Sequence, residues 1–486
     1  MITNFINKYK FYLKRCGKNE IKILIRVHKD DMNKELYFIN KNFQNLNQLN
    51  PELYINDKKY IFKNYFKPDA EGEYNIKLKF DDNFKDCKCM FEGCQSIITI
   101  NFYGLDTTKV VDMSGMFINC FNLYYIDLSC FDTKNVTNMS CMFNGCHNLY
   151  YIDLSFFDTK NVTNMSGMFY GCHNLYYIDL PFFDTKNVVN MSCMFYECWN
   201  LIYLDLTSFD TKKVTNMEYM FYHCAKLKEL NLLSFDTKNV IDMNCMFRDC
   251  EKLEFIDLSS FNTSKVINMS YMFSSCKDLY GIKFNIFDTK NVTNMSHMFD
   301  CCLKLGRINT SLFNTQNVTD MSHMFAGCFN LKKLDLTPFD TRNVVDMSYM
   351  FCCCSDIEIL DVSSFNTENV EDMSYMFKGL YLKKLDVCSF NTKNVKNMKC
   401  MFCDCSKLEN LKLSSFDTKN VTDMSGMFYG CKLLNSLDLS SFNTENVREV
   451  KSIFFQSENI LNKNRSIFDE FDEDDMTKSE NNCMII

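Results

Sequence analysis

Apolar residues recur along most of this chain in a pattern that repeats every 26 residues. The clearest marker is a Met-Phe pair, which keeps this interval until one residue is deleted in "KGLYLKK". Its phenylalanine stands at Phe91, Phe117, Phe143, Phe169, Phe195, Phe221, Phe247, Phe273, Phe299, Phe325, Phe351 and Phe377, and then at Phe402 and Phe428. A fixed period of this length is typical of a solenoid, in which each copy forms one coil stacked on the next.

The first half of a copy predicts a strand. In the copy that begins at residue 146, Leu149, Ile152 and Leu154 form the pattern L-x-x-I-x-L. This is the strand segment of a leucine-rich repeat, and side chains two residues apart on a strand share a face. We therefore expect Ile152 and Leu154 to point inward.

The second half of the copy predicts a short helix. Its apolar residues, separated by three, three and one positions, are Val162, Met165, Met168 and Phe169. Such a spacing places them on one helical face, with Thr163 or Asn164 as the N-cap. The predicted fold is therefore α/β, a leucine-rich-repeat solenoid of about 14 coils with a parallel strand and a short helix in each coil.

Three regions follow from the extent of the repeat. Residues 1–73 lack it, and alternating segments such as "EIKILIRV" and "YNIKLKF" predict a small β-rich N-terminal cap. The solenoid covers residues 74–455. Residues 456–486 are acidic and without a pattern, which predicts a flexible tail.

The repeat explains most of the sulphur in the chain. Of 31 methionines, 27 occupy the two positions of the predicted helix face, where packing is favoured over a metal-binding or peptide-binding stripe. Thirteen of 27 cysteines share the slot three residues after the phenylalanine: Cys94, Cys120, Cys146, Cys172, Cys198, Cys224, Cys250, Cys276, Cys302, Cys328, Cys354, Cys405 and Cys431. Stacked equivalents project their Cβ atoms in parallel, so we expect buried, reduced thiols rather than disulfides or a metal site.

Net charge, histidine positions and apolar stretches exclude several classes of function. A net charge of -8 gives no reason to expect nucleic acid as a partner, because phosphate binding requires a basic face. The six histidines are scattered over variable repeat positions, and we find no catalytic constellation, phosphate loop, cofactor site or small-molecule site. No stretch of 18 apolar residues and no signal peptide are evident. The basic, apolar segment at residues 1–16 fits either a membrane-surface helix or, as we favour, a helix packed on the first strand.

Read in full, the repeat F-D-T-K-N-V-T-N-M-S-x-M-F-x-G-C-x-x-L-x-x-L-D-L closely resembles the BspA-like leucine-rich repeat family. The resemblance covers about residues 74–455. It implies a non-enzymatic protein of recognition or cell adhesion, associated with a surface. The family's partners are not implied, because function depends on sites rather than on the scaffold.

Two outward columns on the predicted strands are candidate sites for a protein partner. They consist of Tyr125, Tyr151, Tyr177 and Tyr203, and of Asp127, Asp153, Asp179 and Asp205. Rigid aromatic side chains with a polar tip dominate recognition surfaces, and stacked aspartates attract a cationic partner. The alternative is structural: tyrosine suits strands, and the aspartates bond to neighbouring Ser or Thr hydroxyls.

The chain ends in "CMII", which fits a C-a-a-X box and predicts prenylation of Cys483. A prenyl group would attach the protein to the cytoplasmic face of a membrane, with the plasma membrane as the favoured one. Display on the cell surface, as the family resemblance implies, would then require unconventional export. The alternative is a soluble cytosolic adaptor without a lipid anchor.

Overall fold

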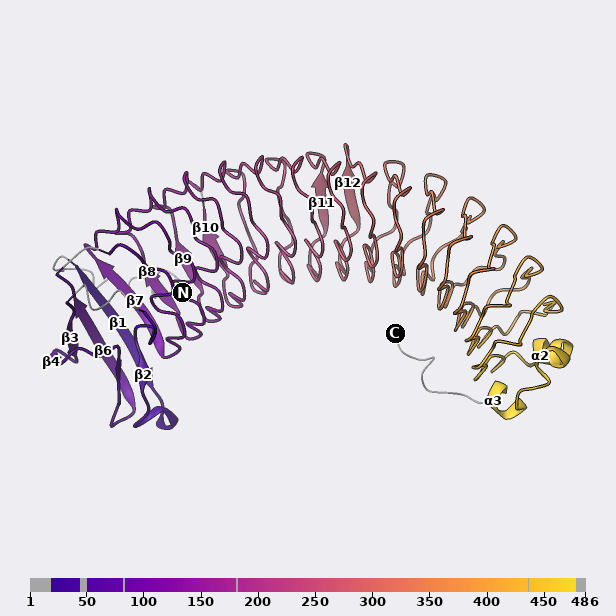
Figure 1. Cartoon of the computed structure of the whole chain (residues 1–486), viewed down its shortest axis with the longest axis horizontal. Coiled ribbons are helices and arrows are strands. Elements are labelled where there is room, and N and C mark those ends of the chain that lie inside the picture. The colour runs from indigo at the N-terminus through magenta and orange to yellow at the C-terminus, as the bar shows by residue number, and fades with distance from the viewer. Residues whose placement is uncertain (1–18, 44–49, 82–83, 181, 436, 478–486) are drawn as a thin grey trace. The chain divides into compact units, whose positions relative to one another are not determined.

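The computed structural model describes residues 19–43, 50–81, 84–180, 182–435 and 437–477 (Figure 1). The chain divides into two compact units. The first comprises Met1–Val214 and His223–Phe235, and the second comprises Thr215–Tyr222 and Asp236–Ile486.

The first unit begins with a six-stranded sheet in the order β4-β3-β6-β1-β7-β8. Strand β1 pairs antiparallel with β6 on one side and β7 on the other, and its alternate residues Ile21, Ile23 and Ile25 are buried. The strands are β1 (Glu20–Val27), β3 (Glu52–Ile55), β4 (Lys58–Tyr60), β6 (Gly72–Lys79), β7 (Ile97–Tyr103) and β8 (Tyr125–Asp127). A second small sheet pairs β2 (Leu36–Tyr37) with β5 (Tyr65–Phe66), and a 3-10 turn, η2, spans Lys29–Asp31.

The N-terminal sheet continues into the repeat coils through parallel strand pairs. Strand β7 pairs in parallel with β8, and β9 (Tyr151–Asp153) pairs in the same way with β10 (Tyr177–Asp179) (Figure 1). In the second unit, β11 (Phe255–Leu258) pairs with β12 (Gly281–Phe284). Partners lie 26 residues apart, as in Ile152↔Ile178, so equivalent positions of neighbouring coils are adjacent. Ile152 and Leu154 are buried, which confirms their predicted inward direction.

The segment predicted as a helix in each coil is instead a pair of tight turns. Val162, Met165, Met168 and Phe169 are fully buried, as expected. The N–H groups of Met168, Tyr170 and Cys172 donate to the carbonyl three residues earlier, within the coil. The intervening N–H groups of Gly167, Phe169 and Gly171 donate to the next coil, at 2.8, 2.9 and 2.7 Å. An α-helix would keep all of these bonds within the coil.

Backbone dihedrals explain why no helix forms. Gly167 and Gly171, two residues before and two after Phe169, have φ of +59° and +67°. A right-handed helix requires negative φ throughout. The same two positions are left-handed in other coils even without glycine, as at Cys141 and Glu197. Asn164 is not an N-cap: it bridges to Asn138 and Asn190, and its Oδ1 accepts the N–H of Ser166 at 3.0 Å.

The interior consists of stacked columns of equivalent side chains. The Phe169 ring stacks on Phe143 and Phe195 with centroid separations of 5.7 and 5.6 Å. All thirteen thiols of the repeat slot are buried. Cys172 shows their common contact, because its Sγ–H donates to the carbonyl of Phe143 at 3.2 Å. The thiols thus satisfy backbone carbonyls in the core, a structural role that agrees with the sequence interpretation.

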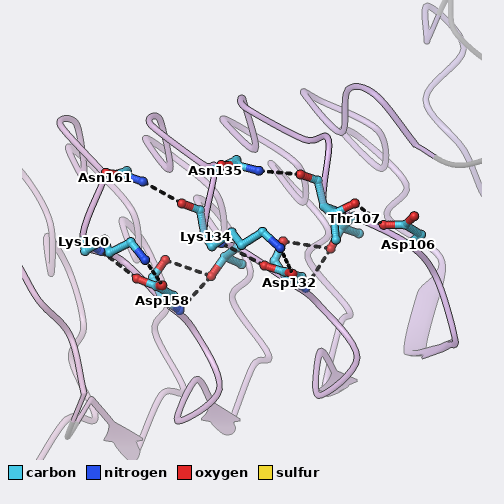
Figure 2. A network of polar contacts seen from close by, with 10 residues as sticks. Asp106, Thr107, Asp132, Lys134, Asn135, Asp158, Lys160 and Asn161 are labelled. Carbon is cyan, nitrogen blue, oxygen red and sulfur yellow. Dashed lines mark hydrogen bonds and ion pairs between the residues drawn. The ribbon is translucent and has the colours of Figure 1, made fainter.

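The "DTKNV" segment joins neighbouring coils through polar contacts (Figure 2). The buried Thr107 hydroxyl donates to the carbonyl of Asp132 at 3.1 Å and accepts the N–H of the same residue at 2.8 Å. Asn135 and Asn161 each donate from Nδ2 to a carbonyl of the preceding coil at 2.7 Å, as Figure 2 shows. In this segment, side chains supply hydrogen bonds between neighbouring coils. The motif therefore holds the coils together and has a structural role.

Residues 456–477 differ from the predicted flexible tail. They form α2 (Glu458–Asn464), η4 (Arg465–Phe468) and α3 (Glu473–Thr477). Four apolar side chains are buried here: Ile460, Leu461, Phe468 and Met476. The N–H groups of Ser452 and Phe454 donate to the carbonyls of Asp475 and Met476. This segment therefore covers the edge of the last coil, which an uncapped solenoid would leave unpaired.

Candidate interaction surface on the strands

The predicted tyrosine column lies on the outer face of the strands in the first unit. Each strand β8, β9 and β10 reads Tyr-Ile-Asp, and the central isoleucine is buried, so tyrosine and aspartate face outward. Tyr151, Tyr177 and Tyr203 stack with centroids 6.3 Å apart at both steps. Exposure rises along the column: Tyr125 and Tyr151 are half-buried, whereas Tyr177 and Tyr203 are 37% and 54% exposed.

Burial gives the half-buried end of the column a distinct chemistry. It raises the pKa of Tyr125 and of Tyr151 to about 12, and the carboxylates of Asp127 and Asp153 add to this effect. Both phenols are neutral hydrogen-bond donors at physiological pH, as an unperturbed tyrosine also is, and burial keeps them neutral to a higher pH.

The aspartate column has a structural role in the turns that follow the strands. Asp153 accepts the N–H and the hydroxyl of Ser155 at 3.0 and 2.6 Å, and Asp205 contacts Thr207 in the same way at 2.9 and 2.7 Å. The bonds from Thr207 lower the pKa of Asp205. These contacts are the turn bonds that the structural alternative predicts. Asp153 and Asp205 are nevertheless exposed, so their remaining acceptor capacity faces outward.

Several exposed aromatic residues in the same coils were not predicted. Phe156 and Phe182 are 61% and 69% exposed, and Trp199 is 38% exposed. Tyr150 and Tyr176 form a second ring column with centroids 5.7 Å apart. Phe156 and Phe182 occupy a slot that holds serine in most copies, so their departure from the repeat was the available signal. The outward tyrosine column forms the aromatic strand face, while Phe156 and Phe182 lie in the turns that follow β9 and β10.

Cys483, the predicted lipidation site, lies outside the described residues, as does the basic segment at residues 1–16. None of the helices in the described part of the chain has the length and apolar character needed to cross a bilayer.

Stacked 26-residue coils with a parallel strand at L-x-x-I-x-L define a repeat solenoid of the leucine-rich type. The chain belongs to the family described as "Mycoplasma protein of unknown function, DUF285", which matches residues 85–202, 189–308, 293–385 and 381–484. No curated protein matches the chain.

The solved structures that are similar to it include two described as follows. One is described as a TLR13-ssRNA13 complex: the identity is 15%, the TM-score is 0.23, and the match covers 73% of this chain but 50% of that one. The other is the functional domain of InlJ from Listeria monocytogenes, which "includes a cysteine ladder". Its identity is 13%, its TM-score is 0.19, and the match covers 70% of this chain and 69% of that one. At these low scores, what either protein binds is not carried over to this chain.

Proposed function

We propose that the protein is a non-enzymatic, BspA-like scaffold of recognition or adhesion that holds a polypeptide partner on the aromatic strand face of its first unit. The observation that supports this proposal best is the outward tyrosine column, which ends in the 54% exposed Tyr203. Exposed aromatic rings on a rigid sheet supply large contact area at low entropic cost.

The chemistry of the face specifies the partner. The aspartate column runs beside the tyrosines, so cationic side chains of the partner gain both a carboxylate and an aromatic ring. Apolar side chains of the partner would cover Phe156 and Phe182. A basic, amphipathic polypeptide satisfies both requirements.

This proposal is tested by changing Tyr125, Tyr151, Tyr177 and Tyr203 to serine together. Binding peptides would first be selected from a random displayed library against the full chain, and their affinities then measured for both forms. Hot-spot aromatics contribute about 1–2 kcal/mol each, so we expect at least a ~100-fold loss. The selected peptides should be rich in Lys, Arg and apolar residues.

A matched control replaces the exposed Phe329 and Tyr381, which lie in the second unit, with serine. It should bind the same peptides with unchanged affinity. Equal binding by the quadruple variant, with circular dichroism showing both proteins folded, would remove the site from the aromatic strand face.

We further propose that prenylation of Cys483 attaches the scaffold to the cytoplasmic face of a membrane, as "CMII" at the end of the sequence suggests. Cells that express the wild type and Cys483→Ser would be fractionated into membrane and cytosol. We expect the wild type in the membrane fraction and a shift of the variant to the cytosol. The same partition for both proteins would favour the soluble adaptor.

A further inference from the structure

A ladder of stacked rings runs along the second unit, away from the strands. Its members occupy the slot two residues before the repeat phenylalanine: Tyr271, His297, His323, Tyr349 and Tyr375. Successive centroids are 4.2, 4.0, 4.1 and 4.3 Å apart, with interplanar angles of 9–12°. All five residues have φ between +55° and +58°. The left-handed backbone of each coil therefore aims these rings in one direction.

One carboxylate lies beside the two imidazoles at the centre of this ladder. Asp300 Oδ2 is 3.0 Å from Nδ1 of His297. One ligand atom each from His297, Asp300 and His323 lies within 4.8 Å of the other two. Within the part of the chain that the structure describes, no other trio of His, Cys, Asp or Glu side chains meets this distance. All three residues are half-buried, between coils that follow directly in sequence.

The slot that holds Asp300 carries no cationic side chain in the two adjacent coils. Asp300 stands in the slot one residue after the repeat phenylalanine. Neighbouring coils place the small residues Ser274 and Ala326 in this slot, whereas Arg248 occupies it two coils earlier and Lys378 three coils later. A cationic side chain in this slot of an adjacent coil would repel a metal ion, and a large side chain there would cover the trio.

We propose that His297, Asp300 and His323 form a binding site for a divalent first-row transition-metal ion, with Zn²⁺ as the best fit. Imidazole nitrogen and carboxylate oxygen are typical zinc ligands, at about 2.0–2.2 Å. Three protein ligands leave a fourth position for water or for a donor from a partner.

Binding requires a local rearrangement that can be observed. In the ion-free chain, His297 donates its Nδ1–H to Asp300, and the ion replaces this proton. Tetrahedral coordination brings the ligand atoms to about 3.4 Å from one another, so the two imidazole planes must open from their 12° stack. The site therefore links two adjacent coils, at residues 297 and 323, through one ion.

The test is a titration of the full-length chain with Zn²⁺, followed by histidine side-chain NMR. The chain has six histidines, so few resonances are expected. We expect those of His297 and His323 to shift together at one equivalent, and Co²⁺ to give visible absorption typical of nitrogen and oxygen ligands without thiolate charge-transfer bands. Mg²⁺, which prefers oxygen ligands in octahedral geometry, should shift neither histidine.

Three variants separate this site from binding by the many cysteines. His323→Gln and Asp300→Asn should each weaken the response of His297 to Zn²⁺ by at least about tenfold. His147→Gln is the matched control, since His147 also stacks on a histidine, at 4.3 Å, but lies in the first unit. It should leave the response unchanged. If Zn²⁺ shifted neither imidazole, or if both variants bound it with unchanged affinity, the trio would be a structural ion pair only.

Discussion

The free energy of unfolding should fall steeply as the pH rises above about 8.5, the pKa of a thiol in an unfolded chain. Burial raises the pKa far above this value for the slot thiols Cys94, Cys120, Cys146, Cys172, Cys198, Cys276, Cys302, Cys328, Cys354, Cys405 and Cys431, and to about 12 for Cys224. The folded chain therefore keeps these protons at a pH at which the unfolded chain releases them.

The direction of this pH dependence follows from the difference between the folded and unfolded pKa values of the thiols. Because the folded pKa is the higher one, the stabilisation is complete below the unfolded pKa and is lost as the pH rises above it. Each thiol reduces the free energy of unfolding by about 1.4 kcal/mol per pH unit, or about 2 kcal/mol between pH 8 and pH 10. The six thiols in the first unit, from Cys94 to Cys224, together account for about 12 kcal/mol, which is comparable to the whole stability of a typical domain.

Urea unfolding at a series of pH values measures this slope, and Cys172→Ser supplies the control. Serine has no thiol to ionise, yet its hydroxyl can donate to the same carbonyl. The chain contains this arrangement at Ser457, which occupies the slot and donates to the carbonyl of Phe428 at 2.8 Å. The variant should lose about 1.4 kcal/mol per pH unit from the alkaline slope. An unchanged slope would mean that Cys172 ionises equally in both states.

The core was predictable because it repeats. Phe169, Met165 and Ile152 recur at fixed positions in copy after copy, as expected for apolar side chains that stack in a buried column. The two tight turns that replace the expected helix were not predictable from the same residues. Spacings of three, three and one suit one helical face, but they suit two successive turns equally well. The deciding signal was Gly167 and Gly171, because glycine tolerates the left-handed backbone that a helix excludes.

The end of the chain shows how composition can mislead. Residues 469–475 are strongly acidic, which is typical of disordered segments. The structure instead buries Ile460, Leu461 and Phe468 against the last coil. These few apolar residues suffice because the coil already presents an unpaired edge to cover. The need of a solenoid to cover its last coil would have predicted the structure of this segment better than its local composition does.

The two surfaces differ in how far sequence could reveal them. The outward direction of Tyr177 and Tyr203 follows from the period-2 alternation of a strand. The trio of His297, Asp300 and His323 spans two copies of the repeat. It becomes visible only when equivalent slots are placed next to one another, and the histidines taken singly looked scattered.

Equivalent positions of successive coils are stacked, so that sulphur-containing and aromatic side chains form interior columns. Methionine oxidation reports on this stacking. The 27 methionines of the repeat are at most 1% exposed, whereas Met32 is half-buried near the N-terminal sheet. Peroxide converts an accessible thioether to a sulfoxide, and a buried one reacts only after the chain opens.

The most direct measurement is therefore peroxide treatment of the native chain, followed by mass spectrometry of each methionine. We expect Met32 to oxidise while Met165, Met168 and their equivalents stay reduced, and all of these methionines to react at similar rates in urea. Oxidation of the repeat methionines in the native chain as fast as Met32 would contradict the stacked interior.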